Sequence, residues 1–549
     1  MSKKKQPIPP QPGSVEEKLH EISTELVAKG KFVEALRQLM VLAADHVTNA
    51  QLWMLIGHIY ARIANWSDAL GALDTAIALD PLQWQAHRIK ALALFSLGRR
   101  QEACTLIDKV VKHSNENGDW MLRAYIHAHT STDPMVALQT ARDWGKRFAD
   151  PLTRNAKPLK VQDRNPRKKL KIGYVTADFR EHSVAFFMLP VLQHHNPGNV
   201  EIHVYFNGHW DHVTPQMRVL VPHWLDIMDM SDEEVCKQIR EDQIDILVDL
   251  SGFTQGHRLG VFARRAAPVQ VTWLGYLLPL GMKAMDYRLV SRASAPPDHD
   301  AHYSETLFRV PGMACYTPPN YAPLCEEPPL IKKGYPTLVS LNSSAKITNE
   351  MLSTWGKILN QREDARLIIL VKEENSEAAQ KCMLPRVEAA GMPLERVSVL
   401  HQQPLSNFME LGHIADIALD TSPISGGTTT LHTIWMGMPI VTFDAVRSVD
   451  ASTARMLKGG LSPCGVVVNS EEDYINAVID LMDDHERLIQ IRATSRNLLK
   501  KSGFMNYPKR TNDIEKAFRF MWGNYLLDKK KAKDVASDWQ GLMTELERK

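Results

Sequence analysis

Residues Leu419–Pro439 read LDTSPISGGTTTLHTIWMGMP, and this stretch decides how the fold is interpreted. An apolar strand over Ile414–Leu419 leads into a loop of small residues around Gly426 and Gly427. Three threonines then open a helix: Thr428, Thr429 and Thr430. A loop between a strand and a helix start presents unpaired backbone N–H groups at the positive end of the helix dipole, where a phosphate binds well. The motif therefore predicts a phosphate site, although an ordinary capped strand–helix turn has a similar sequence.

Length, charge and cysteine content indicate a cytoplasmic protein of several domains. The chain has 549 residues, enough for about three or four domains with cores of their own. Its 65 Lys and Arg against 63 Asp and Glu leave a net charge of +2, so no global field favours nucleic acid or an anionic membrane as a partner. The six cysteines have no paired spacing, which favours reduced thiols over disulfides or a metal site. Neither a signal peptide nor a membrane-spanning run is evident, and we expect the cytoplasm.

The first part of the chain repeats with a period of about 34 residues. The clearest copy begins at Ala50, with small residues such as Gly57 and Ala69 where two antiparallel helices approach each other, and Pro81 ends it. A looser fourth copy has three residues of the pattern: Tyr125, Ala137 and Ala141. The pattern predicts tetratricopeptide-like repeats over 15–150. Such stacks bind polypeptides on a concave face, so we expect an acceptor protein there, and support of the enzyme or formation of a homo-oligomer is the alternative.

After residue 150 the sequence changes to alternating strands and helices. Two sets of apolar runs, separated by a proline-rich span from Pro311 to Pro336, predict two parallel sheets. The first set of expected strands is Ile172–Val175, Ile202–Phe206, Ile244–Leu250, Val269–Leu274 and Tyr287–Val290. The second set is Leu338–Leu341, Leu367–Val371, Val397–Leu400, Ile414–Leu419, Ile440–Phe443 and Val466–Val468. Two Rossmann-like domains without a Gly-x-Gly-x-x-Gly turn favour a nucleotide-sugar transferase over a dehydrogenase.

These boundaries define the expected domain order. The expected domains are a disordered tail (1–14), helical repeats (15–150), a linker (151–168), an N-terminal Rossmann-like domain on the acceptor side (169–320), a linker (321–336), a C-terminal Rossmann-like domain that binds the nucleotide sugar (337–505), and C-terminal helices (506–549). The expected fold class is thus α-helical tetratricopeptide repeats followed by α/β, with a GT-B-type pair of Rossmann-like domains and a cleft between them.

Five motifs in the second part of the chain resemble one family. They are YVTADFREH at Tyr174–His182, APVQVTWLGY at Ala267–Tyr276, CYTP at Cys315–Pro318, NSSAKI at Asn342–Ile347, and DT at Asp420–Thr421 with GGTTT at Gly426–Thr430. This ordered set resembles the O-linked N-acetylglucosamine transferase and SPINDLY family of protein glycosyltransferases, which join tetratricopeptide repeats to a two-domain catalytic region. The resemblance covers most of the chain, and the CYTP segment leans toward the SPINDLY branch and its bacterial relatives.

The resemblance implies transfer of a sugar from a nucleoside diphosphate to a protein side chain, usually Ser or Thr, with inversion and with neither a metal nor another cofactor. Without a metal, the departing diphosphate needs positive charge and N–H donors from the protein. The family match assigns this role to Lys346, for which a solvated surface lysine is the alternative. It places His182 beside the sugar and acceptor, where a histidine can take a proton near neutral pH, unless it only caps a helix. Asp178 would orient His182 or cap the helix, and Tyr276 would line the sugar pocket or pack in the core.

Other positions of the expected donor site depart from the family pattern. Asn342 precedes Ser343, which stands where the N-acetylglucosamine transferases carry a longer amide. Gly427 replaces a histidine, and His432 stands where relatives usually have an acidic residue for the ribose hydroxyls. Phe408 lies where a side chain that stacks on the base could reach. The donor is therefore open among UDP-N-acetylglucosamine, UDP-glucose and GDP-fucose.

Two other functions fit parts of the sequence. The first is a noncatalytic scaffold, in which the repeats bind a partner and a degraded transferase domain senses a nucleotide. The departures at Ser343, Gly427 and His432 favour this function, whereas the presence of Lys346 and of the threonine run favours the enzyme. The second is transfer to a small molecule or a glycan, which would leave the repeats idle and predicts that deletion of Ser14–Asn115 leaves activity unchanged.

Overall fold

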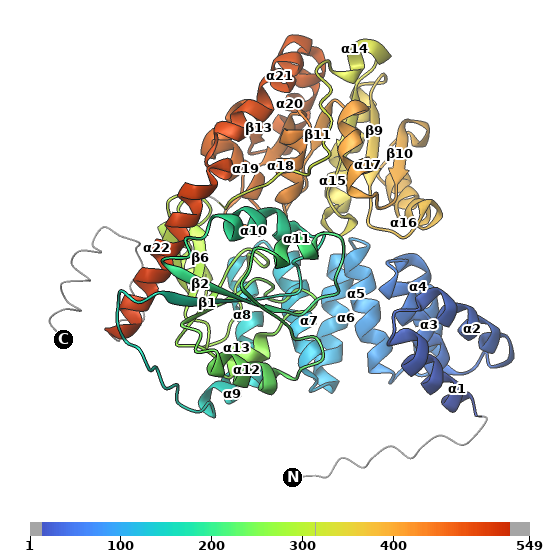
Figure 1. The fold of residues 1–549 in the computed structure, drawn as a ribbon. Helices are drawn as coiled ribbons and strands as arrows, with labels where there is room; N and C mark the ends of the chain where they lie inside the picture. The colour runs from blue at the N-terminus through green and yellow to red at the C-terminus, as the bar shows by residue number, and fades with distance from the viewer. Residues whose placement is uncertain (1–13, 313, 528–549) are drawn as a thin grey trace.

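The computed structural model describes residues 14–312 and 314–527. It shows a stack of helices followed by two α/β lobes, and the predicted fold class is confirmed (Figure 1). We call the lobe built on strands β1 to β7 the N-lobe and the lobe built on β8 to β13 the C-lobe. The predicted tail up to residue 13 and the last part of the expected C-terminal helices, from residue 528, lie outside the described residues.

The helical repeats form antiparallel pairs. Their helices are α1 (Val15–Glu21) with its π-helical continuation η1 (Ile22–Val27), α2 (Phe32–Asp45), α3 (Ala50–Arg62), α4 (Trp66–Leu79), α5 (Trp84–Ser96), α6 (Arg100–His113), α7 (Asn117–Thr130), α8 (Pro134–Trp144), η2 (Gly145–Ala149) and α9 (Asp150–Arg154). First helices begin at Ala50 and again at Trp84, which agrees with the expected period of about 34 residues. A Cβ on Gly57 would lie 2.6 Å from Leu73 Cγ, so the small residue allows α3 and α4 to approach closely.

The N-lobe is a seven-stranded parallel sheet in the order β3-β2-β1-β4-β5-β6-β7. Its strands are β1 (Leu170–Thr176), β2 (Val200–Phe206), β3 (His223–Asp226), β4 (Ile246–Asp249), β5 (Val269–Thr272), β6 (Tyr287–Ser291) and β7 (Thr306–Val310). Its helices are α10 (Ser183–His194), α11 (Thr214–Arg218), α12 (Asp232–Glu241), α13 (Leu259–Ala263) and the 3-10 helix η3 (Pro297–His302). Both edge strands, β3 and β7, are additional to the five strands expected from the sequence.

The C-lobe is a six-stranded parallel sheet in the order β10-β9-β8-β11-β12-β13. Its strands are β8 (Thr337–Ser340), β9 (Arg366–Leu370), β10 (Val397–Leu400), β11 (Ile417–Leu419), β12 (Ile440–Phe443) and β13 (Gly465–Val468). Its helices are α14 (Pro329–Lys333), η4 (Ser344–Lys346), α15 (Asn349–Gln361), α16 (Ser376–Ala389), η5 (Leu394–Arg396), α17 (Leu405–Glu410), η6 (Leu411–His413), α18 (Thr428–Trp435), α19 (Ser452–Met456), η7 (Leu457–Leu461), η8 (Ser462–Cys464), α20 (Glu471–Asp483), α21 (His485–Lys501) and η9 (Gly503–Met505). All six expected strands are present, although β11 is shorter than predicted.

The last described helix, α22 (Tyr507–Leu526), returns from the C-lobe to the N-lobe (Figure 1). Its side chains Phe518, Met521 and Trp522 are buried in the same core as strands β1, β2 and β4. Glu515 of this helix accepts a hydrogen bond from the backbone N–H of Asn196 at 2.7 Å. The C-terminal helix therefore completes the N-lobe core and links the two lobes.

Strand order places a binding crevice in each lobe. In both sheets the chain reverses direction across the sheet between its first and fourth strands, β1 and β4 in the N-lobe and β8 and β11 in the C-lobe. Open α/β sheets bind ligands in the crevice outside the carboxyl ends of the two strands at such a reversal. The sequence motifs that begin at Tyr174, Asn342 and Asp420 all follow or end these strands.

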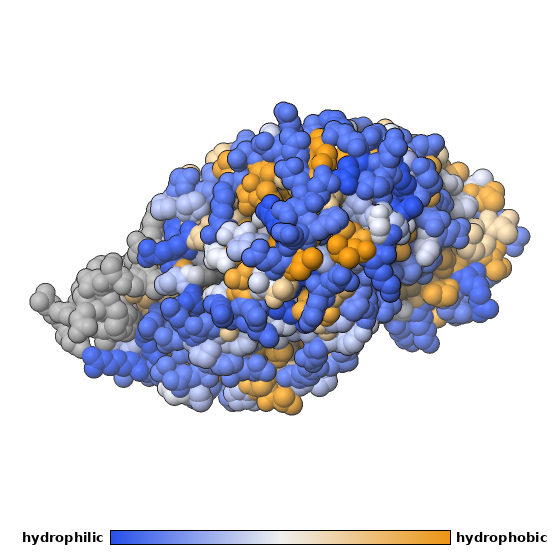
Figure 2. Space-filling model, turned by 90° about the horizontal axis from the view of Figure 1, so that it is seen from above, coloured by the Kyte–Doolittle hydropathy of each residue, from blue (hydrophilic) through white to orange (hydrophobic). Residues whose placement is uncertain are grey.

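Most apolar side chains are gathered in interior clusters. Seen from above the C-lobe, the surface is mainly hydrophilic and its hydrophobic residues form separate small patches (Figure 2). None of the helices in the described part of the chain combines the length and apolar character needed to cross a bilayer.

Candidate active site

Lys346 ends the short turn η4, which follows the carboxyl end of β8. Its side chain is half-buried, and its ammonium Nζ donates to the carbonyl oxygen of Ser425 at 2.8 Å and to Asn342 Oδ1 at 3.5 Å. Burial lowers the pKa of the Lys346 ammonium, and the nearby carboxylate of Asp420 acts in the opposite direction. Because both direct acceptors are uncharged oxygens, the positive charge remains available to an anion. The lysine is therefore directed at the glycine loop, and the alternative of a solvated surface lysine does not describe it.

The glycine loop brings backbone amides to the same place. Helix α18 begins after Gly427, and no side chain caps its first turn. The N–H groups of this turn are therefore free to bind an anion. Thr428 and Thr429 are half-buried, whereas Thr430 is buried and shares a hydrogen bond of 2.7 Å with the hydroxyl of Thr453. Of the three threonines expected at the phosphate, the third thus belongs to the internal packing.

The buried carboxylate of Asp420 joins the lysine turn to the glycine loop. Its Oδ1 accepts hydrogen bonds from the N–H of Gly426 at 2.8 Å and from Asn342 Nδ2 at 2.9 Å. Its Oδ2 accepts from the Thr442 hydroxyl at 2.7 Å. Since β8 and β11 are neighbours in the sheet, the loops that follow them meet, and Asp420 fixes one against the other. Asn342, predicted to bind the donor, therefore acts inside the site as a partner of Asp420 and Lys346, while Ser343 beside it is exposed.

His182 is the N-cap residue of α10, at the carboxyl-end side of the N-lobe sheet. Its Nδ1 accepts a hydrogen bond from the N–H of Val184 at 3.3 Å, and Asp178 Oδ1 lies 3.6 Å from the same nitrogen. Burial lowers the pKa of His182 to about 4 and raises the pKa of the buried Asp178 carboxyl to about 6. The imidazole is therefore neutral at pH 7. Because Nδ1 accepts a hydrogen bond, the ring proton is held on Nε2, which makes Nε2 a donor rather than a base.

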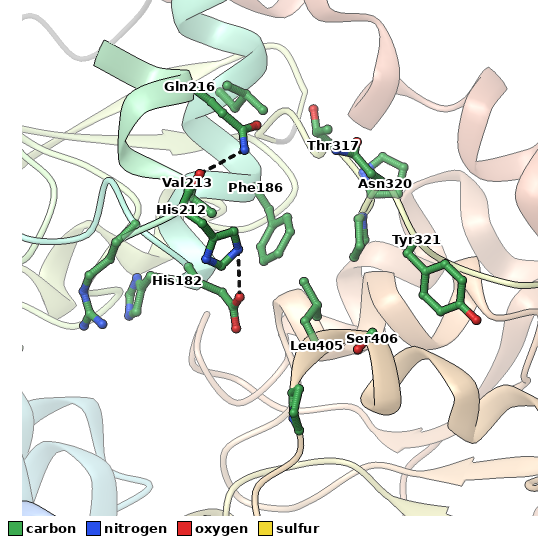
Figure 3. A pocket seen from close by; sticks show the side chains of 17 residues that line it. His182, Phe186, His212, Val213, Gln216, Thr317, Asn320, Tyr321, Leu405 and Ser406 are labelled. Carbon is green, nitrogen blue, oxygen red and sulfur yellow. Dashed lines mark hydrogen bonds and ion pairs between the residues drawn. The ribbon is translucent and has the colours of Figure 1, made fainter. Parts of the chain in front are cut away.

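A cavity of about 350 Å³ lies beside His182, between the lobes. Figure 3 shows that α10 and α11 line it on the N-lobe side, and that the start of α17 and the segment Thr317–Tyr321 line it on the other. This volume is in the range of small-molecule sites. Phe186 connects the cavity to the glycine loop, because it lines the cavity and its ring centroid lies 4.9 Å from that of His432 on α18, with the two rings nearly perpendicular. Lys346 is not among the lining residues, so the candidate site has two adjoining parts.

His432 is buried in an aromatic cluster. Its Nδ1 shares a hydrogen bond of 2.6 Å with the hydroxyl of Tyr316, and its ring centroid lies 6.0 Å from that of the half-buried Phe408. Burial lowers the pKa of His432 to about 3, so the ring is neutral. His432 was expected to bind the ribose, and one of its two ring nitrogens is already hydrogen-bonded to Tyr316. Tyr316 belongs to the CYTP segment, which links that motif to α18.

Tyr276 lies away from this cavity, and the structure favours the core-packing alternative for it. The ring is 3% exposed and packs against Phe253 at 5.3 Å and against Tyr125 of α7 at 6.2 Å. Its hydroxyl has no hydrogen-bond partner among the described residues. Tyr276 is therefore part of the contact between the N-lobe and the helical repeats.

One group of side chains in the described part of the chain has the spacing of metal ligands, and it lies outside the crevice. Glu201 and His203 are near the amino end of β2, and His223 lies opposite on the edge strand β3. The two imidazole rings are stacked at 4.2 Å, and the ammonium groups of Lys169 and Lys171 lie 4.0 and 3.9 Å from Glu201 oxygens. The crevice is at the opposite, carboxyl ends of the strands, so this group is not part of the candidate site.

Comparison with known proteins decides the family. The model of glycosyl transferase family 41 matches residues 152–314 and 337–514, more than half of the chain. The chain belongs to glycosyltransferase family 41. The family 41 match includes both lobes and contains His182, Lys346 and the glycine loop. The resemblance seen in the five sequence motifs is thereby confirmed.

Individual relatives support this placement in family 41. The SPINDLY proteins of Solanum lycopersicum and Arabidopsis thaliana, each named as a probable UDP-N-acetylglucosamine–peptide N-acetylglucosaminyltransferase, are 34% and 33% identical to it over 428 and 431 residues. Each alignment covers 76% of this chain but only 45% and 46% of the relative, so the chain spans less than half their length. A solved structure of a mutant O-GlcNAc transferase from Thermobaculum terrenum has a TM-score of 0.86 and 30% identity, and the match covers 93% of this chain and 98% of that one.

Sequence reasoning missed the residues that organise this family 41 site. Asp420 was recognised only as part of a motif, although a buried carboxylate directly after a strand is a signal for a structural hub. Arg180, in the bend before α10, lies within the Tyr174–His182 motif but received no role, and Leu405, at the start of α17, belongs to none of the five motifs, although both line the cavity.

Proposed function

We propose that this family 41 protein is a protein glycosyltransferase, which transfers a sugar from a nucleoside diphosphate to a side-chain hydroxyl of Ser or Thr. The observation that carries the proposal is the contact between Lys346 and the glycine loop at the carboxyl ends of the neighbouring strands β8 and β11. An ammonium group and the uncapped amides of α18 form a cradle for a diphosphate.

The chemistry follows from where charge develops. As the acceptor oxygen bonds to the sugar carbon, the bond to the diphosphate breaks and negative charge grows on the leaving group, and the hydroxyl proton of the acceptor passes to the departing diphosphate or to water. Lys346 and the first-turn amides stabilise this charge, and one such donor contributes about 3 kcal/mol to lowering the barrier. We place the sugar and acceptor beside His182, whose Nε2–H would hold one of their oxygens in position. Attack from the side opposite the diphosphate gives inversion.

The donor and the need for metal are further parts of the proposal. We propose that the lysine and the amides supply the positive charge that a metal would otherwise provide, so EDTA should leave the rate unchanged. UDP-N-acetylglucosamine, UDP-glucose and GDP-fucose remain the candidate donors. The two SPINDLY relatives bear a UDP-N-acetylglucosamine name, which makes that sugar the first to test.

The compartment and the acceptor site are proposed from different observations. None of the six cysteines, all within the described residues, forms a disulfide, and this agrees with a reducing cytoplasm. We place the acceptor protein on the helical repeats, whose stacked pairs offer an extended surface to a polypeptide.

The test uses purified full-length protein with each candidate nucleotide sugar. Diphosphate release without an acceptor, followed by intact-mass analysis of proteins co-expressed with it, should give one preferred donor and sugar-sized mass additions. Absence of both activities, combined with binding of the nucleotide, would favour the noncatalytic scaffold instead. Sugar addition to small molecules only, with no protein modified, would contradict the protein acceptor.

A further inference from the structure

The turn that carries Lys346 is held from outside its own lobe. Arg100, at the start of α6 in the helical repeats, donates from Nε at 2.9 Å and from Nη2 at 2.5 Å to the carbonyl oxygen of Ala345. The two residues are 245 positions apart in the sequence. The methyl group of Ala345 also packs against the apolar core of the third repeat. A side chain of the repeats thus grips the residue directly before the lysine.

The residue after the lysine is fixed to the same repeat. Arg386 of α16 donates from Nη2 to the carbonyl oxygen of Ile347 at 2.7 Å and from Nη1 to that of Leu97, at the end of α5, at 2.9 Å. The backbone on both sides of Lys346 is therefore tied, through two guanidinium groups, to the helix pair α5–α6.

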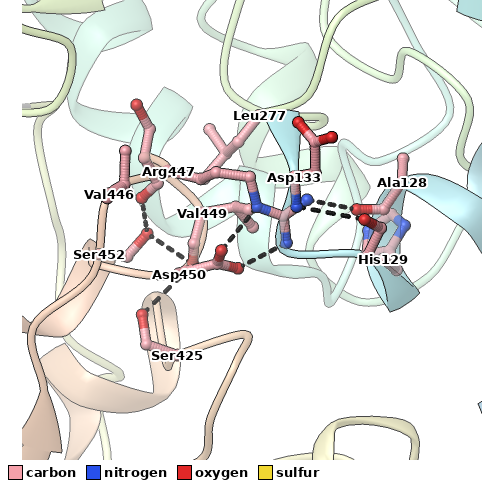
Figure 4. Close-up of polar contacts among 12 residues, drawn as sticks. Ala128, His129, Asp133, Leu277, Ser425, Val446, Arg447, Val449, Asp450 and Ser452 are labelled. Atoms are coloured by element: carbon pink, nitrogen blue, oxygen red, sulfur yellow. Dashed lines mark hydrogen bonds and ion pairs between the residues drawn. The ribbon is translucent and has the colours of Figure 1, made fainter. Parts of the chain in front are cut away.

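The glycine loop is anchored to the repeats as well (Figure 4). Arg447 donates to the carbonyl oxygen of Ala128 at 2.8 Å and forms a two-point ion pair with Asp450, both within the loop that leads to α19. Ser425 donates to a carbonyl of this loop at 3.3 Å. Arg100 also donates to the carbonyl oxygen of His129 at 3.2 Å. Arg100 and Arg447 therefore both bind carbonyl groups in the last turn of α7. These carbonyl groups lie at the negative end of the α7 dipole, so they accept hydrogen bonds from cationic side chains well.

Arg100 is buried, and none of its hydrogen-bond partners among the described residues carries a negative charge that would neutralise its guanidinium. Its residue is 6% exposed, and both of its acceptors are backbone carbonyls. Burial lowers the pKa of Arg100 to about 10, so the guanidinium is still charged at pH 7. Burying a cation among carbonyls alone costs free energy. This cost indicates that the placement or the charge of Arg100 serves a purpose.

We propose that Arg100 is a positioning residue of the donor site, supplied by the helical repeats, which sets where the Lys346 ammonium stands relative to the glycine loop. This inference rests on the proposed function. The repeats are then a structural part of the catalytic centre and not only an acceptor-binding surface. Deletion of Ser14–Asn115 would remove Arg100, so loss of activity after that deletion would not show that the repeats bind the acceptor.

The charge of Arg100 gives the inference a second, separable readout. Burial is the main cause of the lowered pKa of Lys346, and the positive charge of Arg100 lowers this pKa further. Replacement of Arg100 by glutamine removes both its charge and the two hydrogen bonds from its guanidinium to Ala345. Replacement by lysine keeps the charge but loses the planar guanidinium that makes these two hydrogen bonds. The pKa of Lys346 should therefore rise in Arg100→Gln and stay near its wild-type value in Arg100→Lys.

The experiment compares full-length wild type, Arg100→Gln, Arg100→Lys and the matched control Arg99→Gln. Arg99 is the neighbouring residue, is paired with the exposed Glu102 and has no contact with the C-lobe among its hydrogen bonds. We expect kcat/KM for donor hydrolysis to fall at least tenfold in both Arg100 variants and to remain unchanged in Arg99→Gln. The pH at which the rate falls on the basic side should move upward only in Arg100→Gln.

Labelling of lysine amines at a series of pH values, read peptide by peptide, gives the pKa of Lys346 without any activity. An upward shift in Arg100→Gln alone supports the inference even if no donor is hydrolysed, and an unchanged Lys346 profile overturns it. Wild-type protein that neither binds nor hydrolyses a nucleotide sugar contradicts the proposed function instead. Thermal unfolding shows whether each variant folds. If Arg100→Gln does not fold, Arg100→Lys carries the kinetic test, and a rate of Arg100→Lys within twofold of wild type overturns the inference.

Discussion

Replacement of Gly426 by alanine tests the packing on which the glycine loop depends. A Cβ at this position would lie 2.4 Å from Thr430 Oγ1 and 3.2 Å from Asp420 Oδ1, whereas ordinary contacts begin near 3.4 Å. Thr430 or the loop must therefore move by about 1 Å, at a cost typical of overpacking, about 1–3 kcal/mol. Loss of the hydrogen bond between Thr430 and Thr453 adds about 1 kcal/mol. We expect the free energy of unfolding to fall by about 2–4 kcal/mol.

The same movement should affect catalysis. A displacement of about 1 Å in groups that position a reacting centre lowers the rate by about 100-fold, and we expect this loss in kcat for donor hydrolysis. Urea unfolding followed by tryptophan fluorescence gives the stability, and release of diphosphate gives the rate.

Gly427→Ala is the matched control for this variant. A Cβ at Gly427 has no atom within 4 Å, so that variant should lose no more than the roughly 1 kcal/mol that alanine costs at a helix N-cap. If Gly426→Ala is as stable and as active as wild type, the tight contact with Thr430 does not define the loop and the reasoning is refuted.

Three further variants test neighbouring groups. His182→Asn keeps a good helix cap but removes the Nε2–H that faces the cavity, so transfer should fall at least tenfold while calorimetry shows unchanged diphosphate affinity. Asp178 has a pKa of about 6, above its ordinary 3.8, so its ionised form destabilises the fold; Asp178→Asn should be more stable than wild type by roughly 3 kcal/mol at pH 8, and urea unfolding should show the gain vanish below pH 4. Glu373, buried at the contact with Trp66 of the repeats, has its pKa raised by burial to about 7, so Glu373→Gln should raise the melting temperature at pH 8.5 but not at pH 5.

The sequence predicts the central C-lobe strands β8, β11 and β12 well because they are buried on both faces and therefore read as nearly continuous apolar runs. The edge strand β3 has no such signal. Its residues His223–Asp226 are exposed or half-buried, so the apolar run that marks a strand is absent. The last helix α22 was expected as a helix, but its return into the N-lobe core depends on packing across the whole chain.

The candidate site is predictable to the extent that it follows strand ends. Lys346 and the glycine loop come directly after β8 and β11, and parallel strands bring such loops together. Contacts between distant segments were not predictable. The Tyr316 hydroxyl that engages His432 is 116 residues away from it, and Arg100 reaches Ala345 across a domain boundary. No periodicity or short motif records either pairing.

The most direct measurement is calorimetric binding of UDP and GDP to wild type and to Lys346→Met, a substitution that keeps an unbranched side chain and removes its charge. The account predicts that one nucleoside diphosphate binds wild type, that the variant binds it at least 100-fold more weakly and does not hydrolyse the donor sugar, and that its melting temperature is not lowered. Equal affinity in the two proteins, with an unchanged rate of donor hydrolysis, would contradict the claim that Lys346 holds the departing diphosphate.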